Sequence, residues 1–252
     1  MSKLIDKLNQ VAKAVPQPIG FRTGQSASTK TKILLIASLA QANNVSGADA
    51  VLITKLSSGA KSIQKIAQSL PDIPWGLFLG DIDRRGIRPM VEAGCDFVVF
   101  PASTALAIPE GDKIGKILQV EASLSEGLLR AVNELPADAV LIASEQEGEY
   151  SLTWRHLMLF QRFADLLTKP LLVSMPLNVT ANELQILWET GVDGVVVEVG
   201  SGQPVGRLEE FRQTIDKLTF PPRQRKKVEA LLPRIGEETS PVTEAEEEEE
   251  GE

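Results

Sequence analysis

Four short segments of the chain share one order of polar and apolar positions. A small or helix-breaking residue comes first, an aspartate stands two positions later, and an apolar run follows, in Gly47–Ile53, Gly94–Phe100, Pro136–Ile142 and Gly191–Val197. The aspartates are 47, 42 and 55 residues apart, which is too far for one β–α unit of roughly 20 to 30 residues and suits two such units. The segments therefore predict every second strand of an alternating βα chain.

A second pattern predicts the strands between these four. Amphipathic helical stretches end at prolines, which cannot continue a helix, and short apolar runs follow them. The predicted strands, in chain order, are 18–22, 49–53, 75–79, 97–100, 116–120, 139–143, 171–174 and 194–197. Near-continuous apolar strands are typical of parallel sheets that are covered on both faces. Eight of them favour a single closed parallel (βα)8 barrel over an open doubly wound sheet.

Segment 32–38 allows two assignments. Its β-branched residues fit a strand, but its continuation to Asn43 keeps apolar residues at helical spacing. It also lies where a helix must join the first predicted strand to Asp49, so we predict a helix. In the alternative, 32–38 is the first strand, 18–22 becomes an N-terminal plug, and the number of strands stays at eight.

The net charge of −8 belongs mainly to the end of the chain. Residues 220–252 carry ten acidic and five basic side chains, a balance of −5, which leaves −3 on residues 1–219. A like-charged run of low hydrophobicity cannot repay the entropy of ordering. We therefore predict a barrel over 1–219 and a disordered, basic-then-acidic tail over 220–252. The tail suits a solubilising role, with docking to a basic partner as the alternative.

The charge of the barrel, the lengths of its apolar runs and its cysteine count exclude several classes of protein. A near-neutral barrel without a basic stripe argues against nucleic acid as a partner. No apolar run reaches about 18 residues and no leader pattern opens the chain, so we expect a cytoplasmic protein without a membrane partner. The single cysteine, Cys95, excludes an intrachain disulfide and favours a small core residue over a nucleophile. A homo-oligomer is compatible with the sequence.

Candidate chemistry lies just past the strands, because active sites of closed parallel barrels form where the strands end. Hard cations such as Mg²⁺ or Mn²⁺ prefer carboxylate oxygens, and the candidate metal ligands are Asp81, Glu121, Glu145 and Glu198. Glu121 and Glu145 are also candidate catalytic acid–base groups, although a paired structural acid is an equal alternative for Glu121 and Glu198. Lys55 is the lysine placed for catalysis by imine chemistry, which requires a desolvated amine near the barrel mouth and is not favoured here, and it is also a candidate anion contact.

The loop that follows the last predicted strand is rich in glycine and opens a helix. Backbone N–H groups in such a loop approach an oxyanion closely, and the helix start adds partial positive charge. At Gly200-Ser201-Gly202 the chain resembles the aldolase-type, phosphate-binding (βα)8 (TIM) barrels, over roughly residues 3–218. The resemblance implies that these three residues hold a substrate or FMN phosphate, with FMN less favoured than Mg²⁺ or Mn²⁺. Arg22, at a predicted strand end, is a further anion contact.

The chain also departs from that group of barrels. The second Gly-rich turn, expected after the seventh strand, is replaced by Ser-Met-Pro-Leu-Asn at 174–178. Glu198 would repel a phosphate unless a metal or a base neutralised it. Half of the expected phosphate clamp is therefore missing.

Together these features favour a lyase or isomerase that acts on a small anionic metabolite, phosphorylated or carboxylated, with metal assistance. The alternative is a catalytically silent barrel that acts as a binding or scaffold protein through its charged tail. His156, the single histidine, opens a predicted helix, which indicates a surface or capping role and argues against a Ser-His-Asp triad. The repeated aspartates start strands and should lie at the end of the barrel opposite the chemistry.

Overall fold

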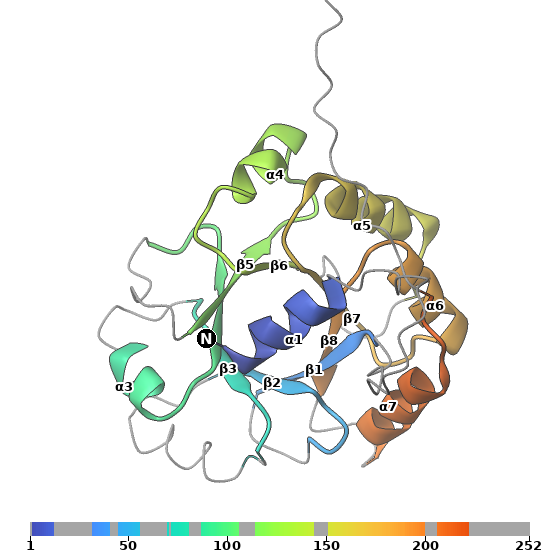
Figure 1. Ribbon diagram of the computed structural model, residues 1–252, viewed down its shortest axis with the longest axis horizontal. Coiled ribbons are helices and arrows are strands. Elements are labelled where there is room, and N and C mark those ends of the chain that lie inside the picture. The colour runs from blue at the N-terminus through green and yellow to red at the C-terminus, as the bar shows by residue number, and fades with distance from the viewer. Residues whose placement is uncertain are drawn as a thin grey trace, which may run out of the picture.

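A computed structural model describes residues 2–12, 32–40, 45–55, 70, 72–80, 87–105, 114–143, 151–199 and 206–221. Eight parallel strands within these ranges close into a barrel, in which each strand pairs with the next and the last pairs with the first (Figure 1). The strands are β1 (Leu34–Leu39), β2 (Ala50–Ile53), β3 (Trp75–Phe78), β4 (Phe97–Pro101), β5 (Gly115–Val120), β6 (Ala139–Ile142), β7 (Leu171–Met175) and β8 (Gly194–Val199). The predicted single parallel (βα)8 barrel is confirmed.

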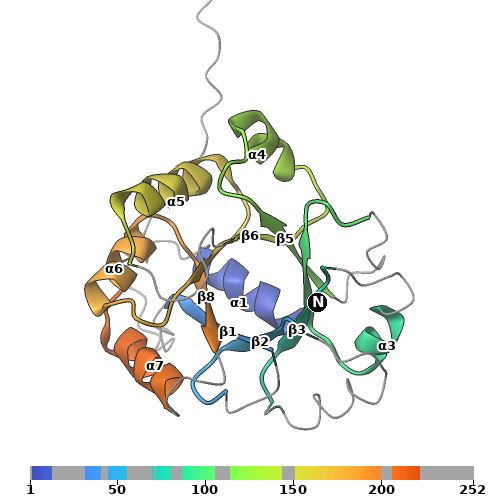
Figure 2. The same ribbon diagram turned by 180° about the vertical axis from the view of Figure 1, so that it is seen from behind.

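Helices surround this barrel on the outside and cross it at one end. The described helices are α1 (Lys3–Ala12), α3 (Ile87–Glu92), α4 (Glu126–Val132), α5 (Trp154–Leu166), α6 (Ala181–Glu189) and α7 (Arg207–Lys217). Figures 1 and 2 show α3 to α7 around the outside, while α1 lies across the barrel axis. No helix in the described ranges is both long enough and apolar enough to cross a membrane.

The first strand of the barrel is Leu34–Leu39, so the prediction of a helix over 32–38 is wrong. All six of its residues are buried, and it pairs with β2 on one side and β8 on the other. A segment that is apolar on every face shows no clear period, and its neighbours in the sheet decide its conformation. The predicted strand at 18–22 lies outside the described residues. The other seven predicted strands are confirmed, each end to within two residues.

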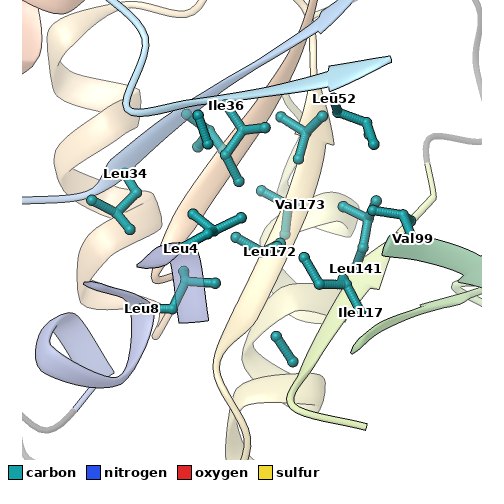
Figure 3. Packing of buried hydrophobic residues seen from close by; sticks show 14 of the residues in the cluster. Leu4, Leu8, Leu34, Ile36, Leu52, Val99, Ile117, Leu141, Leu172 and Val173 are labelled. Carbon is teal, nitrogen blue, oxygen red and sulfur yellow. The ribbon is translucent and has the colours of Figure 1, made fainter. Parts of the chain in front are cut away.

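Helix α1 closes the amino-terminal end of the barrel. Its apolar positions face inward, and Leu4 and Leu8 are both 0% exposed. Figure 3 shows Leu4 beside Leu172 in the barrel interior, with Leu8 next to it on the same helix. Complete burial of one leucine stabilises a fold by about 1.5–3 kcal/mol. Helix α1 is therefore a plug that belongs to the core.

The four repeated aspartates occupy equivalent places at the amino-terminal ends of the even-numbered strands. Each backbone N–H donates to a carbonyl of the preceding strand, over 2.7–2.8 Å, in the pairs Asp49–Leu35, Asp96–Trp75, Asp138–Lys116 and Asp193–Leu171. Three of the carboxylates also accept a hydrogen bond from the N–H of that same partner, over 2.7–2.9 Å, in Leu35, Lys116 and Leu171. The aspartates thus hold strand starts together, and their predicted location away from the mouth is confirmed.

Asp96 uses its carboxylate differently from the other three. It accepts hydrogen bonds from the Ser2 hydroxyl at 2.7 Å and from the backbone N–H groups of Lys3 and Leu4 at 2.8 and 3.0 Å. The first N–H groups of a helix have no partner within the helix, so a carboxylate there acts as a cap. Asp96 therefore joins the plug helix to the start of β4.

Two of the repeated segments begin with glycines that end helices. Gly94 follows α3 and Gly191 follows α6, with φ of +90° and +101°. After α6, the Gly191 N–H donates to Trp188 and the Val192 N–H donates to Leu187, which is the Schellman pattern of helix ends. These glycines turn the chain from the helix into the next strand.

Packing at the end of the barrel extends past the predicted boundary at residue 219. Phe220 is buried, and its ring lies 5.1 Å from the ring of Trp188 on α6. The Trp188 indole N–H donates to the Pro221 carbonyl at 2.8 Å. The remainder of the predicted tail, residues 222–252, lies outside the described residues.

Candidate functional site

The carboxyl-terminal end of the barrel is the candidate site, because α1 fills the other end. Side chains in register on adjacent parallel strands point to the same face of the sheet, and the face alternates along each strand. Leu34 lies inside the barrel (Figure 3), so Ser38, four residues later on β1, also points inward. Ser38 is in register with Glu198 on β8. A hydroxyl and a carboxylate therefore stand side by side near the open end.

The same alternation places two more polar side chains toward the interior. Leu172 faces α1, which puts Ser174 on the inner face of β7 (Figure 3). A Cβ on Gly115 would lie 2.6 Å from the Ile5 side chain of the plug, so Gln119 is on the inner face of β5. The interior is thus apolar against the plug and becomes polar toward the open end.

Burial of these four side chains follows their depth in the barrel. Ser38 is 8% exposed, Gln119 and Ser174 are half-buried, and Glu198 is exposed. The Glu198 carboxylate forms no hydrogen bond or ion pair with the residues that the structure describes. The arrangement offers a carboxylate at the rim and neutral hydrogen-bonding groups below it.

Three of the residues predicted from the sequence as site residues are described. Glu121 directly follows β5, is exposed, and accepts a 3.1 Å hydrogen bond from the Ser123 hydroxyl. Lys55 is exposed two residues after β2. Lys55 follows β2 and Glu198 lies near the end of β8, the two strands that flank β1, whereas Glu121 follows β5 on the other side of the barrel. The structure places all three at the predicted end but not in one cluster.

The other predicted site residues lie outside the described residues. They are Arg22, Asp81, Glu145, Gly200, Ser201 and Gly202. Within the described ranges, no group of three His, Cys, Asp or Glu side chains is arranged to hold a metal ion. The predicted Mg²⁺ or Mn²⁺ site and the phosphate loop therefore remain predictions.

Sequence reasoning missed Ser38, because the segment that carries it was assigned to a helix. The available signal was the alternation of Leu34, Ile36 and Ser38, which puts a serine at the end of one strand face. Gln119 and Ser174 were missed for a simpler reason. Each lies within an apolar strand, where a single polar residue changes the pattern little.

Cys95 and His156 have the structural roles that the sequence predicts. Cys95 is 6% exposed and its thiol donates to the Phe97 carbonyl at 3.2 Å. Burial raises the pKa of this thiol to about 12, so it is not a nucleophile at neutral pH. His156 forms a capping box with Thr153 at the start of α5, in which the Thr153 N–H donates to Nδ1 at 3.1 Å.

Among the lysines that the structure describes, Lys169 has a lowered pKa. Burial lowers this pKa, although the charges of Asp138 and Glu134 oppose the effect. A lowered lysine pKa is typical of imine-forming sites. However, the Lys169 ammonium donates to the carbonyls of Leu135 and Ala137 at 2.7 and 2.6 Å, just before β7 at the plugged end. Its role is to hold that end of the barrel together.

The fold and the polar open end define a TIM-barrel protein. No protein-family model and no curated protein matches the sequence. Solved structures are similar: a mutant tryptophan synthase alpha-subunit from Pyrococcus furiosus has a TM-score of 0.56 and 12% identity, and the match covers 73% of this chain and 96% of that one. Tryptophan synthase from Mycobacterium tuberculosis has a TM-score of 0.55 and 15% identity, covering 73% and 91%.

A third similar structure is orotidine 5'-phosphate decarboxylase from Pyrococcus horikoshii OT3. Its TM-score is 0.53 at 14% identity, and the match covers 73% of this chain and all of that one, at 100%. At such identities the likeness shows the fold. The predicted resemblance to aldolase-type TIM barrels is thereby confirmed at the level of the fold.

Proposed function

We propose that the protein is a cytoplasmic enzyme, a lyase or isomerase that acts on a small anionic metabolite at the open end of the barrel. The observation that carries this proposal is the change of polarity inside the barrel. Against the plug the interior of the barrel is apolar, whereas Ser38, Gln119, Ser174 and Glu198 bring hydrogen-bonding groups to the end where TIM-barrel active sites lie. A few polar groups at one end of an otherwise apolar interior are typical of a small-molecule site.

The residues have distinct roles in this proposal. Glu198 moves a proton to or from the substrate, and the neighbouring Ser38 hydroxyl orients the reacting group. Glu121 acts from the opposite side of the mouth, and Lys55 contacts the substrate anion. Mg²⁺ or Mn²⁺ would neutralise substrate charge, held either by Glu198 or by Glu121 together with the predicted ligands Asp81 and Glu145.

The substrate class rests on two supports. The Gly200-Ser201-Gly202 loop and Arg22 are the residue types that bind a phosphate or a carboxylate. One of the similar structures is, by its name, a decarboxylase of a phosphorylated metabolite. We accordingly favour a phosphorylated or carboxylated substrate.

Thermal unfolding with a ligand panel tests the proposal. The panel contains Mg²⁺, Mn²⁺, inorganic phosphate and small phosphorylated and carboxylated metabolites. We expect at least one to raise the melting temperature in a saturable way, since a ligand that binds only the folded state stabilises it. Glu198→Gln and Ser38→Ala should remove the shift, whereas Glu189→Gln, an exposed acid at the end of α6, should keep it. No shift across the panel, or a shift unaffected by Glu198→Gln, would reject the proposal.

The alternative function is a binding or scaffold protein, and exposed apolar side chains on α5 favour it. Trp154 and Met158 are one helical turn apart and are 80% and 73% exposed. Exposed apolar groups of this size mark contact surfaces when they cluster. We propose for this case that the acidic run in 222–252 binds a basic partner. A polylysine peptide that binds the full chain and not a chain ending at Pro221 would support it, and equal binding to both would reject it.

A further inference from the structure

We propose that the plugged end of the barrel carries a second binding site, for a small zwitterionic metabolite of the amino-acid type. A cavity of about 370 Å³ lies between α1 and the starts of β5 and β6. This volume is within the range of small-molecule pockets, roughly 300–1,000 Å³. The polar side chains that line it are Asp6 and Asn9 from α1, Lys116 from β5, and Asp138 at the start of β6.

The first argument is a break in the repeat of the barrel. The residue whose carbonyl accepts the backbone N–H of each repeated aspartate is apolar and buried in three quarters of the barrel, as Leu35, Trp75 and Leu171. In the remaining quarter it is Lys116, which is half-buried and lines the cavity. The fold does not need a charge there, because the other three quarters form the same backbone pattern without one.

A second departure occurs in the same quarter. The first residue of the repeated segment is glycine in three copies and Pro136 in the third, and Pro136 also lines the cavity. These two sequence exceptions, Lys116 and Pro136, therefore meet at one place. This coincidence indicates a feature that is built into the third repeat rather than an accidental gap.

The walls of the cavity are held in place before any ligand binds. Asp138 is fixed by two hydrogen bonds with the Lys116 backbone, at 2.7 Å and 2.8 Å. Helix α1 is held by Asp96 through Lys3 and Leu4. A Cβ on Gly115, between the walls, would lie 2.6 Å from Ile5. Pre-organised walls lower the entropic cost of binding a small molecule.

The charges of the cavity define the ligand class. Asp6 and Lys116 form no side-chain hydrogen bond or ion pair with other described residues. A ligand ammonium suits Asp6 and Asp138, and a ligand carboxylate suits Lys116 with the Asn9 amide. Inorganic phosphate meets net repulsion from the two aspartates and one lysine, and a simple cation leaves the Lys116 ammonium without a partner. A molecule that carries both charges pairs with the aspartates through its ammonium and with Lys116 through its carboxylate.

The test is a titration of the full-length protein with each of the twenty standard amino acids. Binding is followed by calorimetry and by the melting temperature, with inorganic phosphate and ammonium chloride as single-charge probes. We expect at least one amino acid to bind saturably. Lys116→Met and Asp6→Asn should each weaken that binding by about tenfold or more, since each leaves one ligand charge unpaired.

Matched controls distinguish binding at this cavity from binding at the open end of the barrel. They also distinguish a lost binding site from an unfolded variant. Lys217→Met and Glu209→Gln change exposed residues on α7 and should leave the affinity unchanged, as should Glu198→Gln at the mouth. Circular dichroism checks that each variant is folded. The proposal is overturned if no amino acid binds, if phosphate or ammonium alone gives the same response, or if a folded Lys116→Met protein binds with unchanged affinity. Loss of binding in Glu198→Gln would place the ligand at the mouth and would also overturn it.

Discussion

The carboxylate of Asp96 accepts a 2.8 Å hydrogen bond from the backbone N–H of Lys3, 93 residues earlier in the chain. The same carboxylate binds the Leu4 N–H and the Ser2 hydroxyl. A single side chain at the start of β4 thus caps the plug helix and ties it to the barrel. This contact sets apart one of four otherwise equivalent aspartates, and it predicts unequal effects of mutating them.

Asp96→Ala should lower the free energy of unfolding by about 2 kcal/mol, the upper end of the range for a lost helix cap. Asp138→Ala should cost about 1 kcal/mol or less, because its exposed carboxylate accepts one backbone hydrogen bond. Urea unfolding measures both values. Hydrogen exchange should also show faster exchange of the Lys3 and Leu4 amides in Asp96→Ala alone. Equal destabilisation by the two variants would contradict the capping role.

Gly94 and Gly191 provide a matched pair for backbone strain and packing. Both have positive φ, but a Cβ at 94 meets no atom within 4 Å, while a Cβ at 191 would lie 2.5 Å from the Cβ of Ala164. Gly94→Ala should therefore cost about 1 kcal/mol, for the left-handed conformation alone. Gly191→Ala should cost about 2–4 kcal/mol, because overpacking adds to it. Thermal or urea unfolding tests the difference, and similar costs would show that the contact at Ala164 relaxes freely.

The thiol of Cys95 should be unreactive in the folded protein. Burial raises its pKa from the ordinary value of 9.0 to about 12, so little thiolate forms and the reagent has no access. Labelling with a thiol reagent at pH 8 should be slow without denaturant and fast in guanidinium. Fast labelling of the native protein would contradict the buried position.

The same shift predicts a dependence of stability on alkaline pH. The folded-state pKa of Cys95 lies above the unfolded value, so the unfolded state loses the proton first as pH rises. The stability that the raised pKa of Cys95 contributes to the fold is fully present below about pH 9 and is lost as the pH approaches 12. Cys95→Ala should remove this part of the pH dependence between those values. Identical alkaline profiles of the two proteins would argue against the shift.

The chain should need residues up to Pro221 for full stability. Phe220 is 8% exposed against Trp188, and the Trp188 indole binds the Pro221 carbonyl. A chain that ends at Thr219 should lose about 2–4 kcal/mol, as for a truncated buried aromatic side chain with its hydrogen bond. A chain that ends at Pro221 should unfold at the temperature of the full protein. A melting temperature unchanged by ending at Thr219 would contradict this packing.

Local patterns were enough to predict most of the strands and two side-chain roles. Six of the seven confirmed strands follow from apolar runs that a proline or a repeated aspartate precedes, and the strand at 116–120 follows from its apolar run alone. These signals act within a few residues. Cys95 in the core and His156 at a helix start follow for the same reason. The site could be predicted less well from the sequence, because Ser38 lies on β1, a strand that the sequence pattern predicts as a helix.

The sequence by itself determined the alternation of helices and strands, the class of barrel, and the end at which the repeated aspartates lie. These depend on chain geometry within single βα units. Tertiary structure alone decided that Leu34–Leu39 is the first strand, that Asp96 caps α1, and that Ser38 stands beside Glu198. Each of these requires a partner that is far away in the chain. Barrel closure supplies it for β1 and Ser38 by pairing the first strand with the last, and the packing of α1 against the start of β4 supplies it for Asp96.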